Sequence, residues 1–312
     1  MEASSEAARA PVFVVGAPRS GTHLLRFCLS RHSRLHVAGE TGFFIKIYGN
    51  RRLMPPSSFP RRATEIVDRF LRSGDPTMED VRPLRPLLED AARRASDYRK
   101  LAGGLMGTLA REAGKARWGE KTPFHVLYIP QIRKLYPEAR ILYLTRDSRS
   151  VVASYLRSPL LPDDLALAVA QVRLCVRAGE AAVARRWAHP VRYEELVREP
   201  ESVLRSVSRY IGETFEEAML RPGMRDSSFG GGRLMQREEG RGIEYDPREA
   251  DRWKEVLDPD PAAWVRRLVD GEARGVRVPR AFRRRVRRAE LRQRLMHTRN
   301  RWGFHDLGLP GG

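Results

Sequence analysis

The feature that most constrains the fold is a glycine-containing loop that directly follows an apolar run near the start of the chain. Residues 11–15 (PVFVV) have the composition of a buried strand, and they lead into residues 16–23 (GAPRSGTH). The two glycines have the Gly-x4-Gly spacing of a phosphate-binding loop, in which backbone N–H groups and a helix N-terminus surround a phosphate. The sequence therefore predicts a strand–loop–helix unit of an α/β fold with an anion site at the turn.

This loop lacks the lysine that nucleoside triphosphatases place after the second glycine. Thr22 occupies that position, and the nearest cation, Arg19, lies inside the loop. The backbone can still hold a phosphate, but the side chain that normally reaches the β- and γ-phosphates is missing. We therefore expect a phosphate-containing ligand other than ATP used in the usual way.

Apolar runs alternate with helical patterns along the chain, which is typical of a parallel sheet flanked by helices. Besides residues 11–15, extended segments are expected at 35–37, 141–145 and 190–193, and helical patterns dominate 62–114. We expect an α/β architecture with a central parallel sheet, P-loop-like in its first unit. The predicted organisation is a single domain over residues 1–312, with a helical insertion at about 50–115 and a basic helical tail at about 262–312.

The composition argues against several classes of protein. No run approaches the roughly 18 consecutive apolar residues of a membrane span, and the polar, acidic residues 1–6 do not resemble a secretory signal, so a cytoplasmic protein is expected. Cys28 and Cys175 are expected to be buried thiols. No cluster of Cys and His has the spacing of a zinc site, so no metal is expected.

The net charge of +19 is concentrated near the C-terminal end. Residues 266–301 contain 14 arginines but only three acidic residues. One interpretation is a solvated helical face, with Phe282, Val286, Ala289 and Leu295 turned toward the core. The other is a surface for an anionic partner, such as a polyanion, an anionic membrane or an acidic carrier protein.

A second group of polar residues follows the apolar run 141–145 (ILYLT). Arg146 comes directly after this run, and Ser154 lies eight residues later in a helical pattern. Open parallel sheets bind ligands at the carboxyl ends of their strands, so these residues should lie on the same edge as the glycine loop. Arginine and serine are suitable donors to a phosphate dianion. The ligand should therefore carry two separated phosphates, one at each group.

Taken together, these segments resemble the PAPS-dependent sulfotransferases, including carbohydrate and tyrosylprotein members. PAPS is 3′-phosphoadenosine 5′-phosphosulfate. Residues 16–25 are similar to the family's 5′-phosphosulfate loop, and residues 145–155 to its 3′-phosphate site. Residues 193–196 (YEEL) resemble a segment near the adenosine, and residues 119–123 (GEKTP) a segment of carbohydrate-type members. Residues 241–257 weakly resemble the part that closes over the nucleotide.

The resemblance implies a P-loop-like sulfotransferase fold, with PAPS as donor and adenosine 3′,5′-bisphosphate as product. It assigns the loop residues to the 5′ end, Arg146 and Ser154 to the 3′ end, and Tyr193 to the nucleotide. His23 occupies a place where many members have a second threonine, and its imidazole can also donate to a phosphate. The residues assigned to donor binding are Arg19, Ser20, Gly21, Thr22, His23, Arg146, Ser154, Tyr193 and Arg241.

Transfer to an acceptor needs a base for the acceptor proton and cations for the charge on the departing phosphate. Glu40 is the first candidate base, because it follows the extended segment 35–37 and a glutamate is similarly placed in tyrosylprotein and related bacterial sulfotransferases. Lys121 is expected to stabilise the leaving group together with Arg19. His23 and His125 stay open as alternative acid–base groups. No metal is required by this chemistry.

The implied function is transfer of a sulfuryl group from PAPS to a hydroxyl or amine of a small-molecule, carbohydrate or peptide acceptor. A P-loop nucleotide-dependent kinase is an alternative, although the loop lysine is missing and Arg146 ends a strand where magnesium would need an aspartate. A non-enzymatic polyanion-binding protein that uses residues 266–301 is a third hypothesis. The sequence does not specify the acceptor or the oligomeric state.

Overall fold

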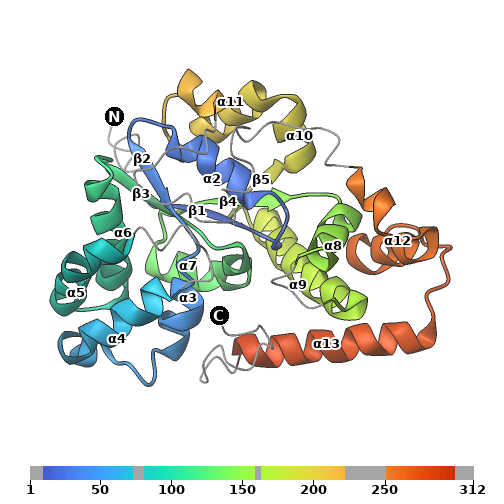
Figure 1. Cartoon of the computed structure of the whole chain (residues 1–312), viewed down its shortest axis with the longest axis horizontal. Coiled ribbons are helices and arrows are strands. Elements are labelled where there is room, and N and C mark those ends of the chain that lie inside the picture. Colours follow the sequence, from blue (N-terminus) through green and yellow to red (C-terminus); the bar gives the residue numbers. More distant parts are fainter. Residues whose placement is uncertain (1–9, 73–80, 159–162, 222–250, 299–312) are drawn as a thin grey trace.

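The computed structural model describes residues 10–72, 81–158, 163–221 and 251–298. Its centre is a five-stranded sheet in which every paired strand is parallel, with the order β2-β3-β1-β4-β5 (Figure 1). The expected α/β class, a central parallel sheet flanked by helices, is confirmed. The strands are β1 (Val12–Gly16), β2 (Leu35–Ala38), β3 (Arg117–Lys121), β4 (Arg140–Thr145) and β5 (His189–Arg192).

Strand β3 is the element that the sequence pattern missed. Three of its five residues are charged, so it shows no apolar run, yet it lies between β1 and β2 and most of it is buried. Gly119 pairs with Val12, and a Cβ atom at Gly119 would lie 2.8 Å from the Val12 carbonyl oxygen. The last expected strand is also shifted by one residue, because Tyr193 begins the helix that follows β5.

The two faces of the sheet carry separate hydrophobic clusters. Alternation along β1 directs Val12 and Val14 to one face and Phe13 and Val15 to the other. The first face is covered by three helices (Figure 1), which are α2 (Thr22–Ser30), α10 (Tyr193–Arg198) and α11 (Pro200–Ile211). Because both faces are covered, the strands are buried and the carboxyl edge of the sheet is where a ligand can reach the strand ends.

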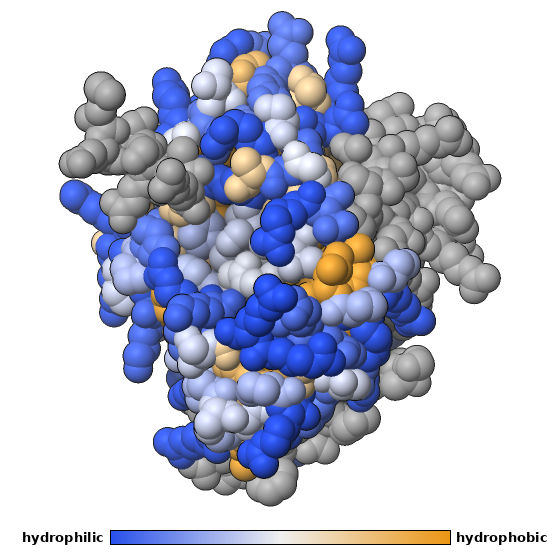
Figure 2. All heavy atoms as spheres, turned by 90° about the vertical axis from the view of Figure 1, so that its left-hand side faces the viewer, coloured by the Kyte–Doolittle hydropathy of each residue, from blue (hydrophilic) through white to orange (hydrophobic). Residues whose placement is uncertain are grey.

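The second face is covered by a larger set of helices, several of which come from the region where helical patterns were expected. Helices α4 and α5 pack together, as do α5 and α6. Figure 2 faces the side of the molecule where α4, α5 and α6 lie, and shows a largely hydrophilic surface with hydrophobic atoms in several places. The elements from this part of the chain are α3 (Phe43–Lys46), η1 (Tyr48–Asn50), η2 (Pro56–Ser58), α4 (Phe59–Leu71), α5 (Arg85–Arg94), α6 (Tyr98–Glu112), η4 (Pro123–Tyr128) and α7 (Ile129–Leu135).

The basic C-terminal segment forms a long helix that packs on α9 of the same face (Figure 1). Val286 is buried, and Phe282 and Ala289 pack against the core as expected. The expectation for Leu295 is wrong, because its side chain is 41% exposed. The remaining elements are α8 (Ser148–Leu156), α9 (Leu165–Ala184), η5 (Glu217–Leu220), η8 (Arg252–Glu255), α12 (Pro259–Val265), η9 (Arg266–Asp270) and α13 (Arg280–Thr298).

Two further expectations concern cysteines and membrane spans. Cys28 and Cys175 are buried free thiols, and burial raises the pKa of Cys175. None of the helices in the described ranges has both the length and the apolar character needed to cross a bilayer.

Candidate active site

The glycine loop connects the carboxyl end of β1 to the N-terminus of α2. Gly21 precedes α2 with a φ of 96°, in the left-handed region that glycine adopts without steric cost. The Tyr193 ring packs directly against it, and a Cβ atom at Gly21 would lie 2.4 Å from Tyr193 Cδ2. A glycine is therefore required here by both the backbone conformation and the neighbouring ring.

The side chains of the loop differ in their surroundings. Ser20 and Thr22 are buried, and the Ser20 hydroxyl donates to the Ala17 carbonyl oxygen at 2.7 Å, which closes the turn. Arg19 has a φ of 69° and extends to the neighbouring helix α8, where its Nε donates to Ser154 Oγ at 3.2 Å. The backbone turn thus leaves an arginine at the rim of the sheet and keeps the two hydroxyl residues inside.

Arg146 lies at the same rim, directly after β4. Its guanidinium stacks over the Tyr193 ring with Cζ 4.2 Å from the ring centroid, and its Nη1 donates to the Arg19 carbonyl oxygen at 3.4 Å. The structure therefore brings together Arg19, Arg146, Ser154 and Tyr193, which come from three different parts of the chain. Arg19 and Ser154, assigned by the sequence to opposite ends of the ligand, are hydrogen-bonded to each other. Arg241 lies outside the described residues.

The candidate catalytic residues form a second group on neighbouring elements. Lys121 is the last residue of β3 and its side chain is 0% exposed, so it is not a loop lysine. Its Nζ lies 2.7 Å from Glu40 Oε1 and 2.9 Å from His23 Nε2, and the last two atoms are 3.3 Å apart. The side chains of His23 and Glu40 are 46% and 36% exposed. A buried ammonium group thus contacts two groups that solvent can reach.

Glu120, the neighbour of Lys121 on β3, holds a fully buried network. Its Oε1 accepts hydrogen bonds from Thr41 Oγ1 at 3.0 Å and from Thr122 Oγ1, and its Oε2 lies 2.8 Å from His125 Nδ1. The backbone N–H of Phe44 donates to His125 Nε2 at 3.3 Å, so Nδ1 carries the proton that is donated to Glu120. Both ring nitrogens of His125 therefore have protein partners. The network fixes residues 41–44, next to Glu40.

The turn that carries Arg146 is anchored by contacts that the sequence did not reveal. Glu194 Oε1 accepts from the Asp147 backbone N–H at 2.8 Å, and the Ser148 hydroxyl donates to Asp270 of η9 at 2.6 Å. Burial alone would raise the pKa of Asp147, but the hydrogen bonds from Arg149 lower it below its usual range. Glu194 belongs to the YEEL segment, but its contact with Asp147 could not be predicted from it, and Asp270 gives no sequence signal of its own because its partner is distant in the chain.

The site is rich in cations, and its carboxylates are paired with them. Within the residues that the structure describes, no group of three or more His, Cys, Asp or Glu side chains is arranged to hold a metal ion. Guanidinium groups, one ammonium group and the N-terminus of α2 instead gather at one edge of the sheet. Such a set can bind phosphate and stabilise negative charge on a ligand.

Comparison with known proteins identifies relatives of this fold and sequence. Residues 11–217 match a family model described as the sulfotransferase family. Protein-tyrosine sulfotransferase 1 of Danio rerio is 24% identical over 220 residues, which are 67% of this chain and 55% of that protein. Nodulation protein NoeE of Sinorhizobium fredii is 24% identical over 293 residues, which are 83% of this chain and 64% of that protein. The chain thus spans little more than half the length of these relatives.

Two solved structures have a similar fold. The sulfotransferase domain from the curacin biosynthetic pathway superposes with a TM-score of 0.60 at 19% identity, covering 87% of this chain and 99% of that one. The sulfotransferase domain from the Synechococcus PCC 7002 olefin synthase has a TM-score of 0.57 at 20% identity, covering 87% and 97%. Both support the arrangement of strands and helices described above.

Proposed function

This chain belongs to the sulfotransferase family, and on that basis we propose that it transfers a sulfuryl group from PAPS to a hydroxyl or amine of an acceptor. The observation that carries the proposal is the meeting of two groups at one sheet edge. One is the set of Arg19, Arg146 and Tyr193 around the glycine loop, and the other is the cluster of Lys121 and Glu40 beside it.

In this proposal the loop and the N-terminus of α2 hold the 5′ end of the donor. The backbone N–H groups of the loop and the positive end of the helix dipole favour an anion there. Arg146 and Ser154 would hold the 3′-phosphate, with Tyr193 beside the nucleotide. The Arg19 side chain would leave Ser154 on binding, which frees the Ser154 hydroxyl for the 3′-phosphate and the Arg19 guanidinium for the 5′ end.

The reaction would use the second group. The acceptor oxygen or nitrogen attacks sulfur and forms the new bond while its proton passes to Glu40. The bond from sulfur to the bridging phosphate oxygen breaks, and the electron pair stays on the departing phosphate. Lys121 and Arg19 would stabilise the charge that develops on this phosphate.

Two histidines take different parts in this proposal. His23 Nε2 lies within reach of both Glu40 and Lys121, so His23 remains an alternative base. His125 is a positioning residue, because both of its ring nitrogens are engaged by Glu120 and the backbone of Phe44. Its effect on the reaction would be exerted through residues 41–44 and the adjacent Glu40.

Calorimetric titration with adenosine 3′,5′-bisphosphate in the absence of magnesium tests the donor assignment. We expect binding in the unaltered chain and a loss of at least about tenfold in affinity for Arg146→Gln, since a charge-assisted contact is removed. Arg157→Gln, at an exposed arginine directly after α8, is the matched control and should change affinity less than about twofold. Magnesium-dependent ATP binding without bisphosphate binding would instead favour a kinase.

Transfer of labelled sulfate from PAPS then tests the reaction itself. A panel of acceptors that contains phenols, sugars, small alcohols, amines and tyrosine peptides would identify the class that accepts the sulfuryl group. Bisphosphate binding without transfer to any acceptor, and without slow transfer to water, would contradict catalysis while leaving the nucleotide site intact.

A further inference from the structure

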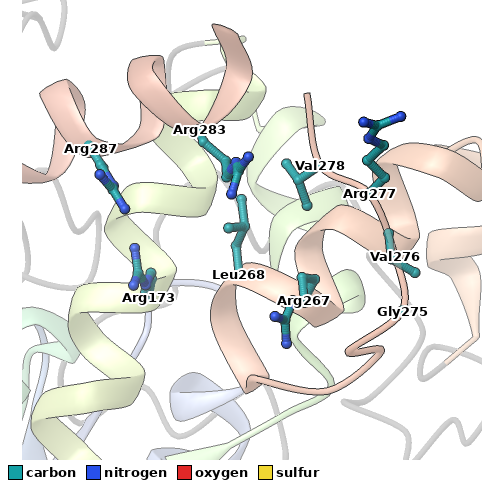
Figure 3. A pocket seen from close by; sticks show the side chains of 9 residues that line it. All are labelled: Arg173, Arg267, Leu268, Gly275, Val276, Arg277, Val278, Arg283 and Arg287. Carbon is teal, nitrogen blue, oxygen red and sulfur yellow. The ribbon is translucent and has the colours of Figure 1, made fainter. Parts of the chain in front are cut away.

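A cavity of about 590 Å³ lies between α9, η9, the segment before α13 and α13 itself (Figure 3). It shares no lining residue with the candidate active site. What distinguishes it is its charge, since five of its lining residues are arginines: Arg173, Arg267, Arg277, Arg283 and Arg287. Leu268 and Val278 contribute apolar surface to the same cavity.

Three of these arginines line the space next to α13 and α9. Arg287 of α13 extends toward Arg173 of α9, and Arg283, one turn before Arg287, extends toward Leu268 (Figure 3). Like charges at positions i and i+4 of a helix repel, and a third guanidinium opposite them adds to the repulsion. An anion between the helices would remove this unfavourable interaction.

The carboxylates of the surrounding elements do not neutralise this group. Arg173 is the only lining arginine that has a carboxylate within 4.0 Å of its guanidinium nitrogens in the described ranges. The other four, Arg267, Arg277, Arg283 and Arg287, have none there. Arg173 pairs with Glu290 of α13, with Nη1 at 3.1 Å from Oε2, but Arg177 and Arg294 contact the same carboxylate. One negative charge is therefore shared among three arginines.

The interior donor of Arg173 is a second, independent observation. Its Nε atom is buried and has no hydrogen-bond partner among the described residues. Burial also lowers the pKa of Arg173. A buried donor without a partner is costly, so a rotation of the Arg173 side chain that turns this N–H toward a ligand oxygen in the cavity would be favourable.

We propose that this cavity is a binding site for a molecule or headgroup that carries at least two phosphate groups. The planar guanidinium fork binds phosphate oxygens in pairs, so several arginines around one cavity can engage more than one phosphate. The cavity volume lies within the range of ordinary small-molecule sites. The site is also connected to the candidate active site, because η9 supplies Arg267 to the cavity while its Asp270 holds Ser148.

The test compares two double variants of α13 that remove the same charge. Arg283→Gln with Arg287→Gln removes two lining arginines, whereas Arg284→Gln with Arg288→Gln removes two exposed arginines of the same helix that do not line the cavity. Inositol hexakisphosphate is titrated into each protein by calorimetry at physiological ionic strength, where nonspecific surface attraction is screened. We expect affinity to fall at least about tenfold for the first pair and less than about threefold for the second.

Vesicles distinguish the two sources of the ligand. Co-sedimentation with phosphatidylcholine vesicles that contain phosphatidylinositol bisphosphate measures headgroup binding, and pure phosphatidylcholine vesicles are the control. Binding to the soluble probe alone indicates that the ligand is a free phosphate ester, and binding to the charged vesicles alone indicates that it is a lipid headgroup. In either case the binding must be lost in the double variant Arg283→Gln with Arg287→Gln. Equal losses in both pairs, or no binding of either probe to the unaltered chain, would overturn the proposal. The comparison does not depend on whether the chain uses PAPS.

Discussion

Replacement of Lys121 by methionine should abolish most of the activity while leaving the fold nearly as stable as before. Methionine keeps the length and the apolar stem of the buried side chain but removes the ammonium group. Among the described residues, Glu40 and His23 contact that group, at 2.7 and 2.9 Å. The two consequences can be estimated separately, because one concerns folding and the other concerns charge that develops only during the reaction.

The effect on stability follows from the exposure of the partners. Glu40 and His23 are 36% and 46% exposed, so water can replace the lost ammonium group, and an ion pair with such a partner is worth about 0–1 kcal/mol. Removing a fully buried ammonium group also removes its desolvation cost, which offsets this loss. The free energy of unfolding of Lys121→Met should therefore differ from that of the unaltered chain by no more than about 1 kcal/mol.

The effect on the reaction should be much larger. If Lys121 stabilises the departing phosphate, its removal corresponds to the loss of one donor to the transition state, which typically costs a factor of about 10² to 10³ in kcat. Affinity for adenosine 3′,5′-bisphosphate, measured by calorimetry, should change less than about tenfold, because the rest of the donor site is unaltered. The expected result is thus a loss of kcat without a comparable loss of binding or stability.

The assay is labelled sulfate transfer at saturating PAPS with the acceptor found in the screen, together with urea unfolding. Lys100→Met is the matched control, because Lys100 is exposed on α6 and its ammonium group contacts the Ser96 hydroxyl at 2.9 Å. It should leave both kcat and unfolding unchanged. Retention of kcat within tenfold in Lys121→Met, or a loss of more than about 3 kcal/mol in stability, would refute a catalytic role and make Lys121 a structural residue.

Other outcomes can be measured on the same protein. Gly21→Ala should weaken bisphosphate binding in calorimetry at least about tenfold, because a residue with a Cβ atom is strained at this φ and would collide with Tyr193; unchanged affinity would show that the loop tolerates movement of the ring. Glu120→Ala should lower the urea-measured free energy of unfolding by about 3–5 kcal/mol, because it leaves a buried polar network without its acceptor; a loss below about 1 kcal/mol would contradict a structural role. Burial lowers the pKa of His36 from 6.5 to about 3, so the unfolded chain binds this proton over a pH range in which the folded chain does not. The contribution of His36 to the free energy of unfolding is therefore constant above pH 6.5 and falls by up to about 1.4 kcal/mol per pH unit as the pH is lowered toward 3. His36→Leu should flatten the slope of the free energy of unfolding against pH in this range. An unchanged slope would exclude His36 as its source.

The sequence was sufficient for the parts of the site that lie next to an apolar run. The glycine loop follows β1 and Arg146 follows β4, so the rule that ligands bind at the carboxyl ends of parallel strands placed both on one rim. The sequence pattern did not predict β3, because this buried strand contains charged residues in place of an apolar run. The reason is physical: the central position of β3 buries its charges against partners elsewhere in the chain, and these partners cannot be read from local composition.

The contacts among the candidate catalytic residues have the same origin. Glu40 and Lys121 are 81 positions apart, and His23 and Lys121 are 98 apart, so only the strand order brings them together. The sequence supplied each residue as a candidate but not their mutual contact, nor the contact of Arg19 with Ser154. The exposure of Leu295 was missed for a different reason: it lies nine residues after Val286, which at about 3.6 residues per turn places it on the opposite face of the helix.

The adjacent residues Glu120 and Lys121 illustrate how one short strand supports both the structure and the proposed chemistry. Successive side chains of a strand point to opposite sides, so neighbours in sequence enter different environments. Glu120 meets only buried hydrogen-bond donors, which makes it a structural acceptor that fixes the segment after Glu40. Lys121 is itself buried, but its ammonium group contacts Glu40 and His23, whose side chains solvent reaches. Loss of Glu120 should therefore act on stability first and on the reaction through Glu40, whereas loss of Lys121 should act on the reaction alone.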